Sequence, residues 1–123
     1  MFLNVILLIM IPFNNRFHGH NSLRFVYNNG QAVRSHSIII KYTTNPHRKR
    51  SRIAIVVSKK VLKSAVKRNR IRRRVYEYIR TKLPYVTGVY DIVLIVTSSE
   101  LLTVAHKEMT NQLDQLFNQA NIK

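Results

Sequence analysis

The sequence has no cysteine, and its few acidic residues are confined to the later part of the chain. Without cysteine there is no disulfide and no thiolate metal site, and a reducing compartment, the cytoplasm, is the expected location. Only 5 of the 123 residues are Asp or Glu, and none precedes Glu77. Five scattered carboxylates offer no obvious pair for metal binding or acid–base chemistry, which argues against a metal-dependent nuclease that acts alone.

Long hydrophobic runs are also lacking. The opening residues, MFLNVILLIM, reach about half of the ~20 apolar residues that a membrane-spanning helix needs. They lack the basic region and the small-residue cleavage site of a signal peptide. We therefore interpret residues 1–9 as an apolar N-terminal extension of unclear role, with Met1 or Met10 as the start. Residues 10–123 are expected to form a single domain, because 14.5 kDa suffices for one core. No membrane partner is expected.

Positive charge dominates the part of the chain that lacks acids. The formal net charge is +16, 17 of the 21 Lys and Arg residues precede Glu77, and nine of these lie within Lys59–Arg74. Such a concentration of like charge destabilises a folded chain through self-repulsion and is typical of a protein that binds a polyanion. A nucleic acid is the expected partner.

The first half of the chain carries the pattern of a helix followed by strands. A short helix is expected over Asn21–Asn29, capped by its first residue and ended by Gly30. Runs of β-branched residues predict strands at Ser37–Thr44 and Arg52–Ser58. The basic stretch Asn45–Ser51 between them is interpreted as a hairpin loop.

The second half predicts a helix, a strand and a helix. The first helix runs from a Ser64 cap to about Leu83, where Pro84 ends it. The apolar run Asp91–Thr97 predicts a buried strand. The last helix, capped by Thr103, is expected to run from Val104 to about Asn118. Its predicted buried face consists of Ala105, Met109, Leu113, Leu116 and Phe117. Together the elements indicate a small α+β sandwich with one sheet.

The basic helix has two distinct faces at 100° per residue. An apolar sector is expected to pack on the sheet: Ile71, Val75, Tyr78, Ile79 and Leu83. A second stripe lies beside it: Asn69, Arg73, Tyr76 and Arg80. Arg68 and Arg72 project close to the apolar sector, where their stems can cover the core and their charged groups can reach a groove. Solvated helices usually mix both signs of charge, yet Lys59–Tyr76 has no acid. We interpret the face as a phosphate-binding surface, with Asn69 suited to a base edge or a 2′-hydroxyl.

One stretch resembles a known family signature. Ser58-Lys59-Lys60 ends a predicted strand, and Ala65–Arg73 reads AVKRNRIRR on the helix that follows. This arrangement resembles the signature of the bacterial ribonuclease P protein subunit. The similarity extends over about residues 11–120 and includes flanking segments at Asn15–Phe17, Leu23–Gly30, Asp91–Val93 and Leu113–Phe117.

The resemblance implies a fold and a function. The fold is an αβββαβα sandwich with a left-handed β-α-β crossover, of the type found in a ribosomal protein domain. The implied function is that of the protein component of an endoribonuclease (a hydrolase). It binds the catalytic ribonuclease P RNA and the 5′ leader of precursor tRNA, and the RNA uses Mg²⁺ to remove the leader. The protein itself is expected to hold no catalytic residue, no metal and no other cofactor, and to require no protein partner.

Site residues are implied position by position. Those expected to contact RNA are Lys59, Lys60, Lys67, Arg68, Asn69, Arg70, Arg72, Arg73 and Tyr76. Those expected to line a cleft for the single-stranded leader are Leu23, Tyr27, Ile40 and Tyr42. The chain departs from the family pattern at Leu23, where a Phe is usual, and at Tyr76, where an Arg is usual. The first departure weakens one stacking contact with a base, and the second removes one phosphate partner.

Two other classes of nucleic-acid-binding protein fit part of the pattern. A ribosomal or other structural RNA-binding protein would share the charge but would not stimulate cleavage of precursor tRNA. A DNA-binding protein would need an exposed recognition helix, whereas this basic helix has an apolar side suited to a sheet. His18 and His20 lack nearby carboxylates, so a surface loop is a better interpretation of them than a metal site.

Overall fold

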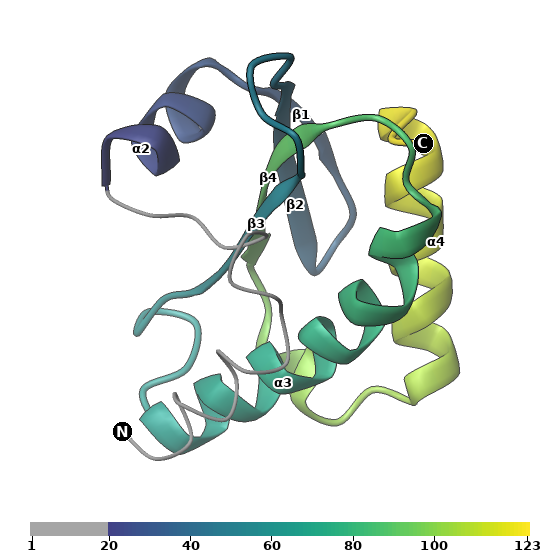
Figure 1. The fold of residues 1–123 in the computed structure, drawn as a ribbon. Helices are drawn as coiled ribbons and strands as arrows, with labels where there is room; N and C mark the ends of the chain where they lie inside the picture. The colour runs from purple at the N-terminus through teal and green to yellow at the C-terminus, as the bar shows by residue number, and fades with distance from the viewer. Residues whose placement is uncertain (1–19) are drawn as a thin grey trace.

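The chain forms one four-stranded sheet with helices on both faces (Figure 1). The computed structural model describes residues 20–123, with side chains from Leu23 onward, so residues 1–19, including His18 and the segment Asn15–Phe17, lie outside the described part. The elements are α2 (His20–Asn29), β1 (Gln31–Arg34), β2 (Ile38–Thr44), β3 (Arg52–Val57), α3 (Ala65–Lys82), the 3-10 turn η2 (Leu83–Tyr85), β4 (Tyr90–Val96), the 3-10 turn η3 (Ser99–Leu102) and α4 (His106–Ala120). The α+β class and the αβββαβα order are confirmed.

The strands lie in the order β1-β2-β4-β3, which makes the prediction of a hairpin at Asn45–Ser51 wrong. β4 lies between β2 and β3, antiparallel to the first and parallel to the second. The basic loop Asn45–Ser51 therefore crosses the end of β4 instead of joining two neighbouring strands. The tight connection is the one between β1 and β2, where the Ser35 backbone N–H donates to the Ile38 carbonyl at 2.8 Å.

The sequence pattern did not reveal β1, which only the family resemblance implied. Its four residues, Gln-Ala-Val-Arg, form an edge strand that is mostly exposed. They therefore carry neither the apolar run nor the alternation by which a buried strand is recognised. The β3–α3–β4 unit joins two adjacent parallel strands, as the resemblance implies.

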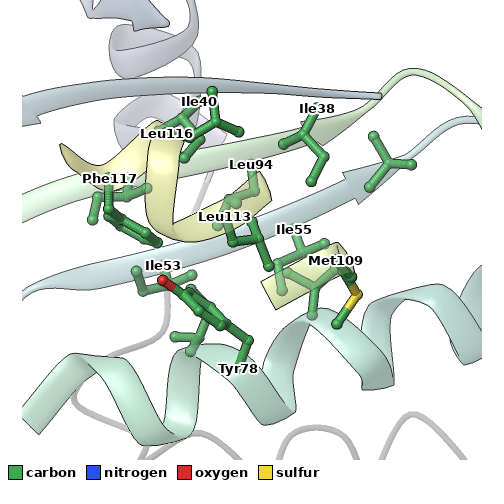
Figure 2. Close-up of a cluster of buried hydrophobic side chains, with 14 of the residues drawn as sticks. Ile38, Ile40, Ile53, Ile55, Tyr78, Leu94, Met109, Leu113, Leu116 and Phe117 are labelled. Carbon is green, nitrogen blue, oxygen red and sulfur yellow. The ribbon is translucent and has the colours of Figure 1, made fainter. Parts of the chain in front are cut away.

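The main core lies between the sheet and the pair of helices α3 and α4 (Figure 2). Alternate residues of β2, β3 and β4 point into it, among them Ile38, Ile53 and Leu94. Figure 2 shows the ring of Tyr78 reaching from α3 toward Phe117 of α4. The two rings stack with their centroids 5.8 Å apart. The predicted apolar sector of α3 is confirmed: four of its five residues are buried, and Leu83 packs against the core edge.

Helix α4 begins later than the sequence predicts. Thr103 caps the C-terminal end of η3, and α4 starts at His106 after Ala105, which provides no side-chain cap. The expectation that Ala105 is buried is wrong, because it precedes the helix and is exposed. The other four residues predicted for the buried face do lie in the core.

Helix α2 covers part of the opposite face of the sheet (Figure 1). It begins at His20, one residue before the predicted Asn21 cap. Val26 of α2 and Val93 of β4 are both fully buried there, outside the main core cluster. Gly30 ends α2 as predicted, and its backbone N–H donates to the Val26 carbonyl at 2.8 Å. One sheet face is thus closed by α3 and α4, and the other is only partly covered.

Candidate nucleic-acid interface

The site begins at the turn that joins β3 to α3. The Ser58 carbonyl accepts hydrogen bonds from the backbone N–H groups of Val61 and Leu62, both at 3.2 Å. At the other end of the loop, the Ser64 hydroxyl accepts from the Lys67 N–H at 3.3 Å, which confirms Ser64 as the N-cap of α3. These bonds close a short turn that carries Lys59 and Lys60 with both side chains exposed.

Arg68 holds this turn against the helix. Its Nη1 donates to the carbonyls of Leu62 at 2.9 Å and Lys63 at 2.7 Å. The side chain is half-buried, as its position near the apolar sector predicts, but its charged group binds the loop backbone instead of standing free in a groove. Arg68 therefore shapes the surface and adds charge to it.

Arg72 and Asn69 form a second fixed pair one turn apart. Arg72 Nη1 donates to Asn69 Oδ1 at 2.7 Å, and its Nη2 lies 3.4 Å from the Val57 carbonyl at the end of β3. Burial lowers the pKa of Arg72, and the like charge of Arg68 acts in the same direction. The guanidinium remains charged, because arginine does not deprotonate in proteins. Because Asn69 Oδ1 accepts a hydrogen bond from Arg72, the amide N–H donors of Asn69 are the groups that can bind a ligand.

The remaining cations of the site are exposed. Their side chains make no hydrogen bond or ion pair in the described range 23–123. This set consists of Lys59, Lys60, Lys67, Arg70 and Arg73. The first turn of α3 contains no acid, so positive side chains stand at the positive end of the helix dipole without compensation. These uncompensated positive charges destabilise the helix when no ligand is bound. Such a surface is typical of proteins that bind phosphates.

Three neighbours on α3 do not belong to the exposed cation set. Arg74 points to the far side, where its guanidinium donates to the carbonyls of Leu101 at 2.6 Å and Val104 at 2.5 Å. Tyr76 is half-buried against the core edge. Arg80 pairs with Glu77 at 3.0 Å on the surface. Arg74 thus joins α3 to the η3–α4 connection, and it does not replace the arginine that is usual at the position of Tyr76.

The uncovered part of the sheet adjoins this basic surface. Ile95 of β4 is paired in register with Ile39 of β2 on one side and with Val56 of β3 on the other. All three side chains are half-buried. The row lies one residue from the ends of β3 and β4, where the Ser58–Ser64 turn begins. We call these three residues the sheet row. It offers apolar contact directly beside concentrated positive charge.

The prediction that Ile40 lines a leader cleft is wrong in register. Ile40 is 0% exposed and lies in the core beneath α3 and α4. Tyr42 shares that side, packs against the core, and donates its hydroxyl to Gln31 Oε1 at 3.0 Å. A one-residue change of register moves every side chain of a strand to the other face. The open face carries Ile39, Lys41 and Thr43 of β2 instead.

The sequence held a signal for this register. Three consecutive isoleucines at 38–40 leave the alternation ambiguous, but Lys41 follows them. A lysine is rarely buried, so Lys41 and its alternate Ile39 belong on the open face.

Helix α2 places the other two predicted cleft residues together. Leu23 and Tyr27 line a surface pocket of about 350 Å³ with Arg24 and Asn28. The Lys41 ammonium lies 4.2 Å from the centroid of the Tyr27 ring and donates to the Tyr27 carbonyl at 2.8 Å. The pair connects α2 to the open side of β2, so the Tyr27 ring and a positive charge occur at one place.

The described residues contain neither a membrane-spanning helix nor a cluster of metal-ligand side chains. No helix among them is long and apolar enough to cross a membrane. Within the same part of the chain, no three His, Asp or Glu side chains gather where they could hold a metal ion.

The fold and the basic surface define a class of small α+β proteins with a surface suited to a nucleic acid, and comparisons with known proteins identify the family. The family model for ribonuclease P matches residues 11–121. The ribonuclease P protein component of a Pseudanabaena species is 36% identical over 110 residues, covering 89% of this chain and 90% of the relative. The corresponding protein of a Synechocystis species is 29% identical and covers 91% and 90%.

Solved structures agree on the fold. The ribonuclease P protein of Staphylococcus aureus superimposes with a TM-score of 0.78 at 22% identity, covering 88% of this chain and 96% of the other. That of Thermotoga maritima gives 0.74 at 23% identity, covering 85% and 96%. The chain belongs to the ribonuclease P protein family. Members are protein components of a ribonucleoprotein endoribonuclease that processes tRNA.

Proposed function

We propose that this chain binds a ribonuclease P RNA and the 5′ leader of precursor tRNA, and thereby assists removal of the leader. The basic surface around the start of α3 contacts the RNA subunit, and the sheet row beside α2 receives the unpaired leader. Mg²⁺ is held by the RNA, which performs the hydrolysis. Residues 10–123 act as one RNA-binding domain in the cytoplasm.

The observation that carries this proposal is the division of the predicted RNA-binding residues into two groups. Lys59, Lys60 and Arg73 belong to the exposed cation set, which is free to neutralise phosphates. Arg68 and Arg72 are half-buried and hydrogen-bonded to the protein, so they fix the shape on which the exposed cations stand. A hydrogen-bonded scaffold that carries exposed charges suits contacts to the backbone of a folded RNA, which require little base reading.

The sheet row supports the leader assignment. Unpaired bases bind to apolar or aromatic surfaces beside positive charge, and Ile39, Ile95 and Val56 meet that description together with Tyr27 and Lys41. The row is short, so it fits a few nucleotides of a single strand and not a duplex.

The direct test is a cleavage assay at low Mg²⁺. The full-length chain is mixed with a bacterial ribonuclease P RNA and a precursor tRNA, and release of the 5′ leader is measured. We expect cleavage that requires the RNA and is stimulated by the protein. Tight RNA binding without stimulation would instead indicate a structural RNA-binding protein.

The leader assignment predicts a selective effect of Tyr27→Ala. This change removes an aromatic ring that is 45% exposed. A stacked base contributes about 1–3 kcal/mol, so affinity of the holoenzyme for precursor tRNA is expected to fall by about tenfold, with affinity for mature tRNA unchanged. Equilibrium binding of the two tRNAs measures the difference.

Phe25→Ala is the matched control for this prediction. Phe25 is also an exposed aromatic of α2, at 58%, but it faces the pocket formed with Pro46 and His47. It should leave precursor binding unchanged. Equal losses in the two variants, or equal losses for precursor and mature tRNA, would contradict the assignment of Tyr27 to the leader.

A further inference from the structure

A second concave site lies at the C-terminal end of α3, and the basic turn lies at the N-terminal end of this helix. Figure 1 shows the two ends of α3 well apart. It is a pocket of about 320 Å³ between the C-terminal turn of α3, the segment 83–89 and the basic loop that precedes β3. An 18-residue helix is about 27 Å long, so this pocket is remote from Ser64 and the turn of Lys59. Its volume falls in the range of pockets that bind small ligands.

The pocket has an apolar floor and a positive rim. Ile79, Leu83 and Val86 form the floor, and Lys49, Arg50 and Arg80 stand around the opening. None of its lining residues is acidic. Arg80 pairs with Glu77 at 3.0 Å on the exposed surface, where such a pair contributes little. Lys49 and Arg50 are exposed and form no hydrogen bond or ion pair within the described residues.

Hydrogen bonds from three segments hold the walls in place. The Val86 N–H donates to the Leu83 carbonyl at 3.1 Å, and the Gly88 N–H donates to the Lys123 carbonyl at 2.7 Å. Ser51 accepts from the Tyr90 N–H at 2.9 Å, and its hydroxyl donates to the Gly88 carbonyl at 3.3 Å. Because the walls are tied to each other, a ligand does not have to order them on binding.

We propose that this pocket binds an unpaired nucleobase of an RNA, with the adjoining phosphates on Lys49 and Arg50. A flat heteroaromatic ring matches an apolar floor, and a phosphate on either side of the base matches a rim without acids. The site would hold the RNA at a second point, which fixes its direction along α3. The inference rests on the proposed function only in taking RNA as the partner.

Methyl NMR of the full-length chain tests the inference. The probes are a single-stranded RNA of about ten nucleotides and an abasic strand of the same length, each added in excess. Val86 and Leu83 report on the pocket, and Val66, which is 57% exposed in the first turn of α3, reports on the basic surface. We expect the RNA to shift the methyl signals of all three residues, and the abasic strand to shift only Val66.

Each alternative result has a separate meaning. Shifts at Val66 without shifts at the pocket would overturn the inference and leave the proposed function intact. Equal pocket shifts with the abasic strand would also overturn it, because the contact would then be to phosphates alone. No shift at any of the three residues would contradict both the inference and the proposed RNA-binding surface.

Two variants sharpen the test. Val86→Phe fills the pocket without changing charge, and we expect it to abolish the Leu83 shift and weaken binding at this site about tenfold, while Val66 still responds. Lys49→Gln should reduce the salt dependence of RNA binding by about one counterion, and Lys107→Gln, an exposed lysine on α4, should not. Unchanged binding in Val86→Phe would overturn base insertion.

Discussion

Arg73 and Arg74 are consecutive on α3, and their guanidinium groups meet different surroundings. Arg73 is exposed, whereas Arg74 is half-buried and donates to two carbonyls, one in η3 and one just beyond it. The difference follows from the 100° rotation between successive helix positions. A run of identical charges in the sequence thus divides into an exposed side chain and a structural one.

The pair predicts opposite outcomes for two alanine substitutions. Arg73→Ala is expected to leave the free energy of unfolding within about 0.5 kcal/mol and to lower the salt slope of RNA binding by about one. Arg74→Ala leaves two carbonyls without their donor and should cost about 1–3 kcal/mol with nearly unchanged RNA affinity. Urea unfolding and filter binding of both variants check this. Equal effects on affinity would mean that Arg74 also reaches the RNA.

Tyr78 provides a pH-dependent prediction. Burial, followed by its hydrogen bond to Asp114 Oδ1 at 2.5 Å, raises the pKa of Tyr78 far above its usual value. The folded state therefore favours the protonated hydroxyl. This stabilisation is complete below the unfolded pKa of about 10 and is lost progressively as the pH rises above it.

Tyr78→Phe should cost about 1–2 kcal/mol at neutral pH. Above about pH 10 the wild type should lose stability faster than the variant, by at most roughly 1.4 kcal/mol per pH unit. Urea unfolding between about pH 8 and 11 measures both quantities. Tyr85→Phe is the control, because Tyr85 is 82% exposed. Parallel pH profiles for wild type and Tyr78→Phe would contradict the assignment.

At the scale of elements, the passage from α2 to β1 requires close backbone approach. A Cβ added to Gly30 would lie 2.6 Å from the Val26 carbonyl oxygen and 3.0 Å from that of Tyr42. Both are backbone atoms, which cannot move without shifting α2 or β2. The position of α2 over the sheet, and with it the location of Tyr27, depends on this contact.

Gly30→Ala is therefore expected to destabilise the fold by about 2 kcal/mol, as overpacking does. Gly88→Ala is the matched control: its added Cβ would approach only the outer atoms of the Tyr90 ring, the nearest at 2.7 Å, and this ring can move. Thermal or urea unfolding of the two variants compares them. A loss for Gly30→Ala no greater than that for Gly88→Ala would show that α2 tolerates displacement.

At the scale of the whole molecule, the net charge of +16 sets the character of binding. If six or more phosphates are neutralised, affinity for RNA should fall by about 10³-fold or more between about 50 and 200 mM salt. Affinity measured over this range gives the number of counterions released. A response that is nearly flat would contradict an interface dominated by the exposed cation set.

The sequence by itself determined the helical and strand positions that carry strong patterns, the Ser64 cap, the apolar sector of α3 and the concentration of positive charge. These features depend on local periodicity and composition, which a single chain displays directly. The arginine-rich signature on α3 indicated the family as well. Lys41 also indicated which face of β2 is open, although the three consecutive isoleucines before it made the alternation ambiguous.

Only the tertiary structure decided which strands are neighbours, which face of the sheet is open and which basic side chains are free. β1 is too short and polar to be recognised alone, and it becomes a strand because β2 offers an edge. The insertion of β4 between β2 and β3 depends on contacts between residues 39 to 58 apart in the chain, which local patterns do not encode. The structural roles of Arg68, Arg72 and Arg74 depend on carbonyl groups that the fold brings to them. Charge is fixed by composition, whereas its availability to a ligand is fixed by packing.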